Sequence, residues 1–165
     1  MKKYEFTGET KQVELLFRTV TLHRIKAVAE FGIVKVGDLG GWIEKEENLS
    51  HDGKAWVYGN AKVWGNAEVC GNAEVCGDAK VCGDAKVFSI SHVLVIGPIG
   101  SRNDFTTFFR DKDSEITVKC GCFLGKIDKF LEKVCETHGD SKYAIVYRTA
   151  AEIAKQQIDL SEEKQ

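Results

Sequence analysis

The sequence predicts a mainly β protein built around a short repeat and ending in a small α+β unit. Six consecutive hexads run between Gly53 and Phe88 and read GKAWVY, GNAKVW, GNAEVC, GNAEVC, GDAKVC and GDAKVF. Apolar residues alternate with polar ones before the repeat, and they recur at helical spacing after residue 126. A fixed short period indicates units that bury their apolar side only by stacking on their neighbours.

Alanine occupies the third position and valine the fifth position of every hexad. This period resembles the hexapeptide repeat of left-handed parallel β-helices, in which a small and an aliphatic residue point inward. The resemblance implies three hexads per coil, so that residue i stacks on residue i+18 and Val57 lies on Val75. Strands one coil apart would then be about 4.8 Å from each other.

Residues 1–52 are predicted to form a β cap on the repeat. Val20 and Leu22 alternate with polar residues around Thr19–Val28, which indicates a strand. The segment KVGDLGGWIEKEENLS (residues 35–50) has turn-forming glycines between apolar anchors and is interpreted as a first irregular coil. A cap is required because an open end would present unpaired backbone groups and bare valines.

Residues 53–88 are the predicted repeat domain, and residues 89–165 a small domain with the order β-β-β-α-α. The three strands are HVLVIGPIG, DFTTFFR and EITVKCGCF (residues 92–100, 104–110 and 115–123). Gly139 is expected to end the first helix, and Asp140 or Ser141 to cap the second. The predicted inner faces are Ile127, Phe130, Leu131 and Val134 in the first helix, and Tyr143, Val146, Tyr147, Ala150 and Ile153 in the second.

Composition excludes several function classes. The net charge of the 165 residues is −2, and the charges are spread evenly, so no segment has the basic excess typical of nucleic-acid binding. No apolar run approaches the length of a membrane span and no signal-peptide pattern occurs, which predicts a cytoplasmic protein without a membrane partner. The six cysteines are then expected to be reduced thiols. Two regular coils bury little area, so a homo-oligomer is expected.

The whole chain is similar to a group of small proteins encoded by phages and prophages. The features that carry this resemblance are GDLGGWIEKEENLS, the GNA and GDA hexads, GPIGSRNDFTTFF, CGCFLG and ETHGD. Members of the group usually have tyrosine where this sequence has Cys70, Cys76 and Cys82. A phage origin implies an accessory role, with inhibition of host defence as the leading hypothesis by analogy with other small phage proteins.

Three aromatic residues of the repeat form a candidate protein-binding patch. Tyr58 and Trp64 follow inward valines, and Trp56 occupies the other outward position, so all three are expected to point away from the coil. Tryptophan and tyrosine are typical interface anchors. The alternative is that the C-terminal domain or another subunit already covers them.

Arg102 and Asn103 are candidate ligand-binding residues. They follow Gly100 in a turn before an aromatic-rich strand, and their side chains could donate hydrogen bonds to a phosphate or a nucleobase. No established nucleotide-binding motif surrounds them. The alternative, which the sequence favours, is a polar turn whose side chains satisfy the local backbone.

A weak metal candidate consists of Cys120, Cys122, Cys135 and His138. A CxC within a strand places both thiols on one face, and residues i and i+3 are neighbours on a helix. Four such ligands would suit a structural zinc site, but the spacing is not a standard one. Free cysteines packed in a core are the favoured interpretation, so neither a metal nor another cofactor is expected.

The repeat fold suggests an acyltransferase or a γ-type carbonic anhydrase, and both need histidine as a general base or a zinc ligand. The hexads contain no histidine; only His51 borders them. The main hypothesis is therefore a non-enzymatic phage protein that binds and occludes a bacterial target, such as a CRISPR-Cas nuclease complex. One alternative is a sponge that sequesters a nucleotide immune signal. The second alternative is an acyltransferase-like enzyme that depends on His51 or His92.

Overall fold

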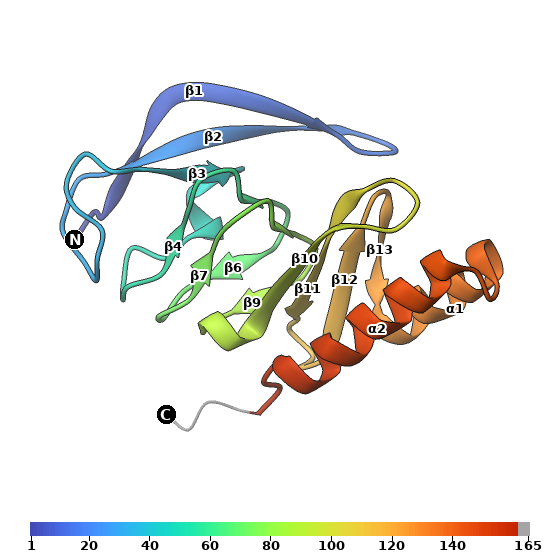
Figure 1. The fold of residues 1–165 in the computed structure, drawn as a ribbon. Helices are drawn as coiled ribbons and strands as arrows, with labels where there is room; N and C mark the ends of the chain where they lie inside the picture. The colour runs from blue at the N-terminus through green and yellow to red at the C-terminus, as the bar shows by residue number, and fades with distance from the viewer. Residues whose placement is uncertain (162–165) are drawn as a thin grey trace.

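The computed structural model describes residues 1–161. The fold is mainly β with two C-terminal helices, so the coarse prediction of β structure followed by an α+β unit is confirmed (Figure 1). Three parts follow one another along the chain: a long hairpin, a coil of very short strands, and a four-stranded sheet carrying the helices. Within residues 1–161, no helix combines the length and the apolar character needed to cross a membrane.

The N-terminal hairpin consists of β1 (Tyr4–Glu14) and β2 (Thr19–Ala27), which pair antiparallel. The predicted alternation holds at Val20 and Leu22, which are buried, but the buried positions then shift to Ile25 and Ala27. The register of β2 with β3 (Leu39–Ile43) is irregular at this point. An irregularity of this kind shifts the buried side chains of β2 by one residue, because side chains alternate strictly between the two faces of a strand.

The hexads form a coil in which parallel strands pair at an offset of 18 residues, as predicted. Val57 pairs with Val75, Val63 with Val81, and Val69 with Val87. All six valines and all six alanines of the hexads are buried. The strands are β4 (Trp56–Val57), β5 (Lys62–Val63), β6 (Glu68–Val69), β7 (Glu74–Val75), β8 (Lys80–Val81) and β9 (Lys86–Val87).

The segment before the hexads lies on the coil as its first, irregular turn. β3 pairs parallel with β5, and Ile43 faces Val63. A Cβ at Gly41 would lie 2.6 Å from the carbonyl oxygen of Ala61, so only glycine permits this close approach. The short 3-10 helix that follows (Glu46–Asn48) ends in a fully buried asparagine. The sheet through this region has the order β1-β2-β3-β5-β8.

The C-terminal unit has one strand more than predicted. Gly121 adopts a φ of +55° and turns the chain between Cys120 and Phe123, which divides the predicted third strand into a hairpin. The antiparallel sheet therefore has the order β10-β11-β12-β13. Its strands are β10 (Val93–Ile99), β11 (Asp104–Arg110), β12 (Ile116–Cys120) and β13 (Phe123–Lys126), and a 3-10 helix (Ile90–His92) precedes them.

The sheet packs between the coil and the helices (Figure 1). Phe109 of β11 belongs to the coil core, whereas Phe108 belongs to a second core under the helices. The inner face predicted for α1 (Ile127–His138) is confirmed by the buried Phe130 and Val134. In α2 (Lys142–Gln157) the prediction is partly wrong, because Val146 and Ile153 are exposed. Here α2 packs through small side chains, and its buried residues are Ala144, Tyr147, Ala150, Ala151 and Ala154.

Candidate functional site

The predicted aromatic patch is not on the surface. Trp56 is 1% exposed, and its ring meets those of Tyr4 and Phe31. Trp64 is 3% exposed and lies in a cluster with Trp42 and residues of β2. Tyr58 is half-buried against the coil core. The prediction of an exposed patch is therefore wrong, because the N-terminal segment covers these faces of the coil.

The two histidines of the acyltransferase-like alternative are both engaged by the backbone. The Nδ1 atom of His51 accepts from the N–H of Lys3 at 3.2 Å, and that of His92 accepts from the N–H of Phe88 at 3.1 Å. In the neutral ring Nε2 therefore carries the proton and cannot accept another. His92 is also buried, and burial lowers the pKa of His51. The choice of these residues as a general base is wrong.

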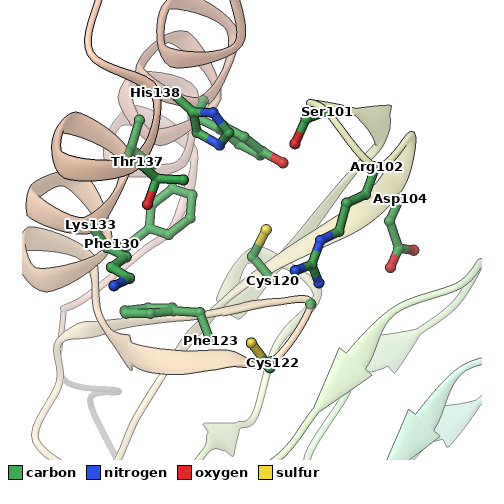
Figure 2. Close-up of a pocket in the computed structure, with 13 residues that line it drawn as sticks. Ser101, Arg102, Asp104, Cys120, Cys122, Phe123, Phe130, Lys133, Thr137 and His138 are labelled. Atoms are coloured by element: carbon green, nitrogen blue, oxygen red, sulfur yellow. The ribbon is translucent and has the colours of Figure 1, made fainter.

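A different histidine lines a pocket of about 190 Å³ in the C-terminal unit. Figure 2 shows His138 and Thr137 on the helical side, Ser101, Arg102 and Asp104 on the opposite side, and the cysteines with Phe123 along the floor. We call this the polar pocket. Its polar lining includes Ser101, Arg102, Cys120, Cys122, His138 and Tyr147.

His138 is held at the pocket by the end of α1. Gly139 follows it with a φ of +56° and ends the helix, as predicted. The imidazole stacks on the ring of Tyr147, with centroids 5.7 Å apart and planes at 29°. Burial is the main cause that raises the pKa of Tyr147 to about 12, and the neighbouring Cys120 adds to it. The phenol therefore stays protonated near neutral pH and is a hydrogen-bond donor.

The structure brings Arg102 to the polar pocket and leaves Asn103 outside it. A Cβ at Gly121 would lie 2.7 Å from Nη1 of Arg102, so the glycine leaves room for the guanidinium. Asn103 has a φ of +48°, and its N–H donates to the carbonyl of Gly100 at 3.3 Å. Asn103 thus stabilises the turn, whereas the side chain of Arg102 can contact an anion or a carbonyl oxygen.

The zinc candidate is not assembled. Cys120, Cys122 and His138 line the polar pocket, but Cys135 is exposed on α1 and does not. Cys120 ends β12 and Cys122 lies in the turn, so the CxC does not place both thiols on one strand face as expected. Across residues 1–161, no three side chains of histidine, cysteine, aspartate or glutamate gather in a way that could hold a metal ion.

A second cavity, of about 670 Å³, lies on the other side of the Gly121–Cys122 turn. We call it the apolar groove. The tip of the β1–β2 hairpin, the coil and the β12–β13 hairpin form its walls. Gly121 and Cys122 line both cavities, so the turn is their common wall. The main apolar residues of the groove are Leu15, Leu16, Phe17, Trp64, Cys82 and Leu124, and its charged residues are Glu14, Arg18 and Lys119.

Lys119 is a buried cation in the wall of this groove. It is 8% exposed, and its ammonium donates a hydrogen bond to the carbonyl of Gly121. Burial lowers its pKa, and burial also raises the pKa of the nearby Cys82 thiol to about 12. Cys82 is therefore a neutral thiol near pH 7 and does not supply a negative charge to the ammonium. The alternating pattern of β12 gave no sign that this lysine is inside.

Comparison with known proteins gives one partial match. The uncharacterized acetyltransferase YdcK of Escherichia coli (strain K12) is 34% identical over 62 residues. The match covers 35% of this chain and 19% of the relative, so the matched stretch spans about a fifth of that protein's length. No family model matches the chain.

This similarity corrects the functional prediction. The resemblance to phage-encoded proteins, together with the lack of histidine in the hexads, predicts a non-enzymatic inhibitor of a host defence effector. The partial likeness to an acetyltransferase contradicts that interpretation and favours the acyltransferase-like alternative instead. The absence of histidine from the hexads does not exclude such an enzyme, because a histidine from α1 lines a pocket outside the repeat.

Proposed function

We propose that this protein transfers an acyl group from a thioester donor to an amine or hydroxyl acceptor. The similarity to an acetyltransferase over 62 residues is the observation that carries the proposal. It is supported by the polar pocket, which places an imidazole, a guanidinium and a phenol around one small cavity. An imidazole can act as a general base, and a guanidinium or a phenol can stabilise an oxyanion.

The proposal extends to the fold of the repeat. We infer that the hexads form a left-handed parallel β-helix of the kind that hexapeptide-repeat acyltransferases have. The offset of 18 residues between paired strands supports three hexads per coil. The glycine that opens each hexad, from Gly53 to Gly83, has a positive φ, which suits a tight corner between strands.

The chemistry follows from the positions around the polar pocket. His138 accepts the proton of the acceptor as its nitrogen or oxygen attacks the thioester carbonyl. Arg102 stabilises the negative charge that develops on the carbonyl oxygen. The new C–N or C–O bond forms, the C–S bond breaks, and the proton on His138 passes to the departing thiolate. The products are the acylated acceptor and the free thiol.

Turnover of acetyl-CoA tests the proposal. The full chain is incubated with acetyl-CoA and a panel of primary amines and alcohols, and free CoA and acylated product are quantified by liquid chromatography. Chromatography is preferred to a thiol reagent because Cys76, Cys122 and Cys135 are exposed. We expect product and free CoA in equal amounts with at least one acceptor class.

Two results would contradict this function. One is the absence of both acetyl-CoA turnover and thermal stabilisation by acetyl-CoA or CoA. The other is stabilisation by cyclic dinucleotides or ADP-ribose alone, which would instead support sequestration of a nucleotide signal.

A further inference from the structure

We propose that the apolar groove binds the hydrocarbon chain of the acyl donor, with the ammonium of Lys119 facing the acyl carbonyl oxygen. This inference rests on the proposed function and specifies its substrate class. It predicts that the preferred donors carry a hydrocarbon chain longer than acetyl, and that an acetyl group uses only part of the site.

The sizes of the two cavities favour this assignment. The polar pocket, at about 190 Å³, is smaller than the usual range of about 300–1,000 Å³ for small-molecule sites, whereas the groove, at about 670 Å³, lies within it. The polar pocket suits the reacting groups and a small acceptor. The groove has room for a longer body, and its wall is mostly apolar.

The hairpin tip supplies the second observation. Leu16 is 74% exposed and Phe17 is 98% exposed, although both line the groove. Two large apolar side chains in solvent at the mouth of an apolar cavity are stabilised when an apolar ligand covers them. A hydrocarbon chain along the groove would contact both side chains and the indole of Trp64.

Lys119 favours a particular chemical group at the end of the ligand that lies next to its ammonium. An ammonium group has three donors, and one of them is directed to the carbonyl of Gly121. A cation that is more than nine-tenths buried in an apolar wall favours an oxygen acceptor on its ligand. The thioester carbonyl is such an acceptor, and it would lie beside the turn that borders the polar pocket. The groove proposed for the hydrocarbon chain and the pocket proposed for the reaction thus share the Gly121–Cys122 turn as a wall.

The test is a binding measurement that does not depend on turnover. Intrinsic tryptophan fluorescence of the full chain is titrated with n-decanoyl-CoA, acetyl-CoA and CoA, with decanoyl-CoA kept below its micelle concentration. Trp64 is the reporter, because it lines the groove. We expect decanoyl-CoA to bind at least about tenfold more tightly than acetyl-CoA, a difference of about 1.4 kcal/mol.

Two substitutions test where the hydrocarbon chain of the donor binds. Leu16→Asp at the exposed tip is expected to abolish the preference for decanoyl-CoA. Its matched control is Ile33→Asp, which introduces the same charge at a residue that is 79% exposed and lines neither cavity, and which should keep the preference. Lys119→Met keeps the aliphatic stem and is expected to weaken decanoyl-CoA binding at least about fivefold. If Lys119→Met does not fold, the comparison of Leu16→Asp with Ile33→Asp still tests whether the hydrocarbon chain lies in the groove.

The remaining outcomes would overturn either the hydrocarbon-chain site alone or the proposed acyl transfer as well. Equal affinities for the two thioesters, or a preference that survives Leu16→Asp, would remove the chain site. If acetyl-CoA were still turned over in such a sample, the proposed acyl transfer would stand without the groove. No binding of any of the three compounds, together with no turnover, would overturn both proposals.

Discussion

The indole ring of Trp56 meets the ring of Phe31 edge-on, with centroids 5.3 Å apart and planes at 65°. Phe31 belongs to the loop between β2 and β3, so this contact fastens the N-terminal segment onto the coil. Tyr4 of β1 meets the same indole at 6.2 Å. An aromatic residue on the outer side of a repeat is thereby part of the core.

Substitution Trp56→Ala is expected to destabilise the protein by about 3–5 kcal/mol, because it leaves a large cavity in a site that is 1% exposed. Urea denaturation followed by circular dichroism measures the change. The control Phe17→Ala removes an aromatic ring that is 98% exposed and should change stability by less than about 0.5 kcal/mol. A similar, small effect of both substitutions would mean that the N-terminal segment does not cover Trp56 in solution.

Substitution Asn48→Ala is expected to cost on the order of 2–3 kcal/mol. The side-chain amide of Asn48 is fully buried and donates to the carbonyls of Ala67 at 2.8 Å and Gly65 at 3.2 Å. Removing it leaves these backbone groups without the side-chain donor at the covered end of the coil. The matched control is Asn66→Ala at an exposed hexad position, which should be nearly neutral. Equal stability of the two variants would show that Asn48 does not stabilise the end of the coil.

Lys3 is expected to make stability increase with pH between about 8 and 10.5. Burial lowers its pKa from 10.5 to about 8, although its ammonium donates to the carbonyl of Ala55 at 2.8 Å. In this pH window the unfolded chain holds more protons than the folded one, so this group's contribution to the free energy of unfolding increases with pH. Below pH 8 both states are protonated and the cost of burying the charge is present in full.

The measurement for Lys3 is the melting temperature as a function of pH for the wild type and for Lys3→Met. The difference between the two curves should change between pH 8 and 10.5 and be flat below pH 8. Lys2→Met, at a neighbouring lysine whose side chain is 59% exposed, should follow the wild-type curve. A constant difference between wild type and Lys3→Met across the window would show that the pKa of Lys3 is not lowered.

Substitution His138→Asn is expected to lower kcat for acyl transfer about 100-fold or more, because the acceptor loses its general base. The half-buried ring lies at the end of α1, so the melting temperature should change little. His23→Asn is the matched control, since His23 is also half-buried but stacks on Phe6 in the hairpin, outside both cavities. Turnover that survives His138→Asn at the wild-type rate would assign the base elsewhere.

Several predictions from the sequence stay predictions. These are the resemblance to phage-encoded proteins, the homo-oligomer, the cytoplasmic location, the bacterial host protein as partner, and the domain boundaries after residues 52 and 88. The helical spacing in α1 and the stop at Gly139 were predictable because local periodicity and a single glycine are sufficient signals. The face of α2 was not, since its alanines pack inward and give a weaker apolar signal than the exposed Val146 and Ile153.

The period of six in the sequence determined which residues of the hexads point inward, and the resemblance to hexapeptide-repeat β-helices added the offset of 18 residues that the paired strands have. Only the tertiary structure decided which outer faces are covered and where the candidate site lies. The polar pocket joins Arg102, Gly121 and His138, and the groove joins the hairpin tip near Leu16 to a turn about 100 residues later. Contacts of that separation depend on how whole elements pack, and no local period encodes them.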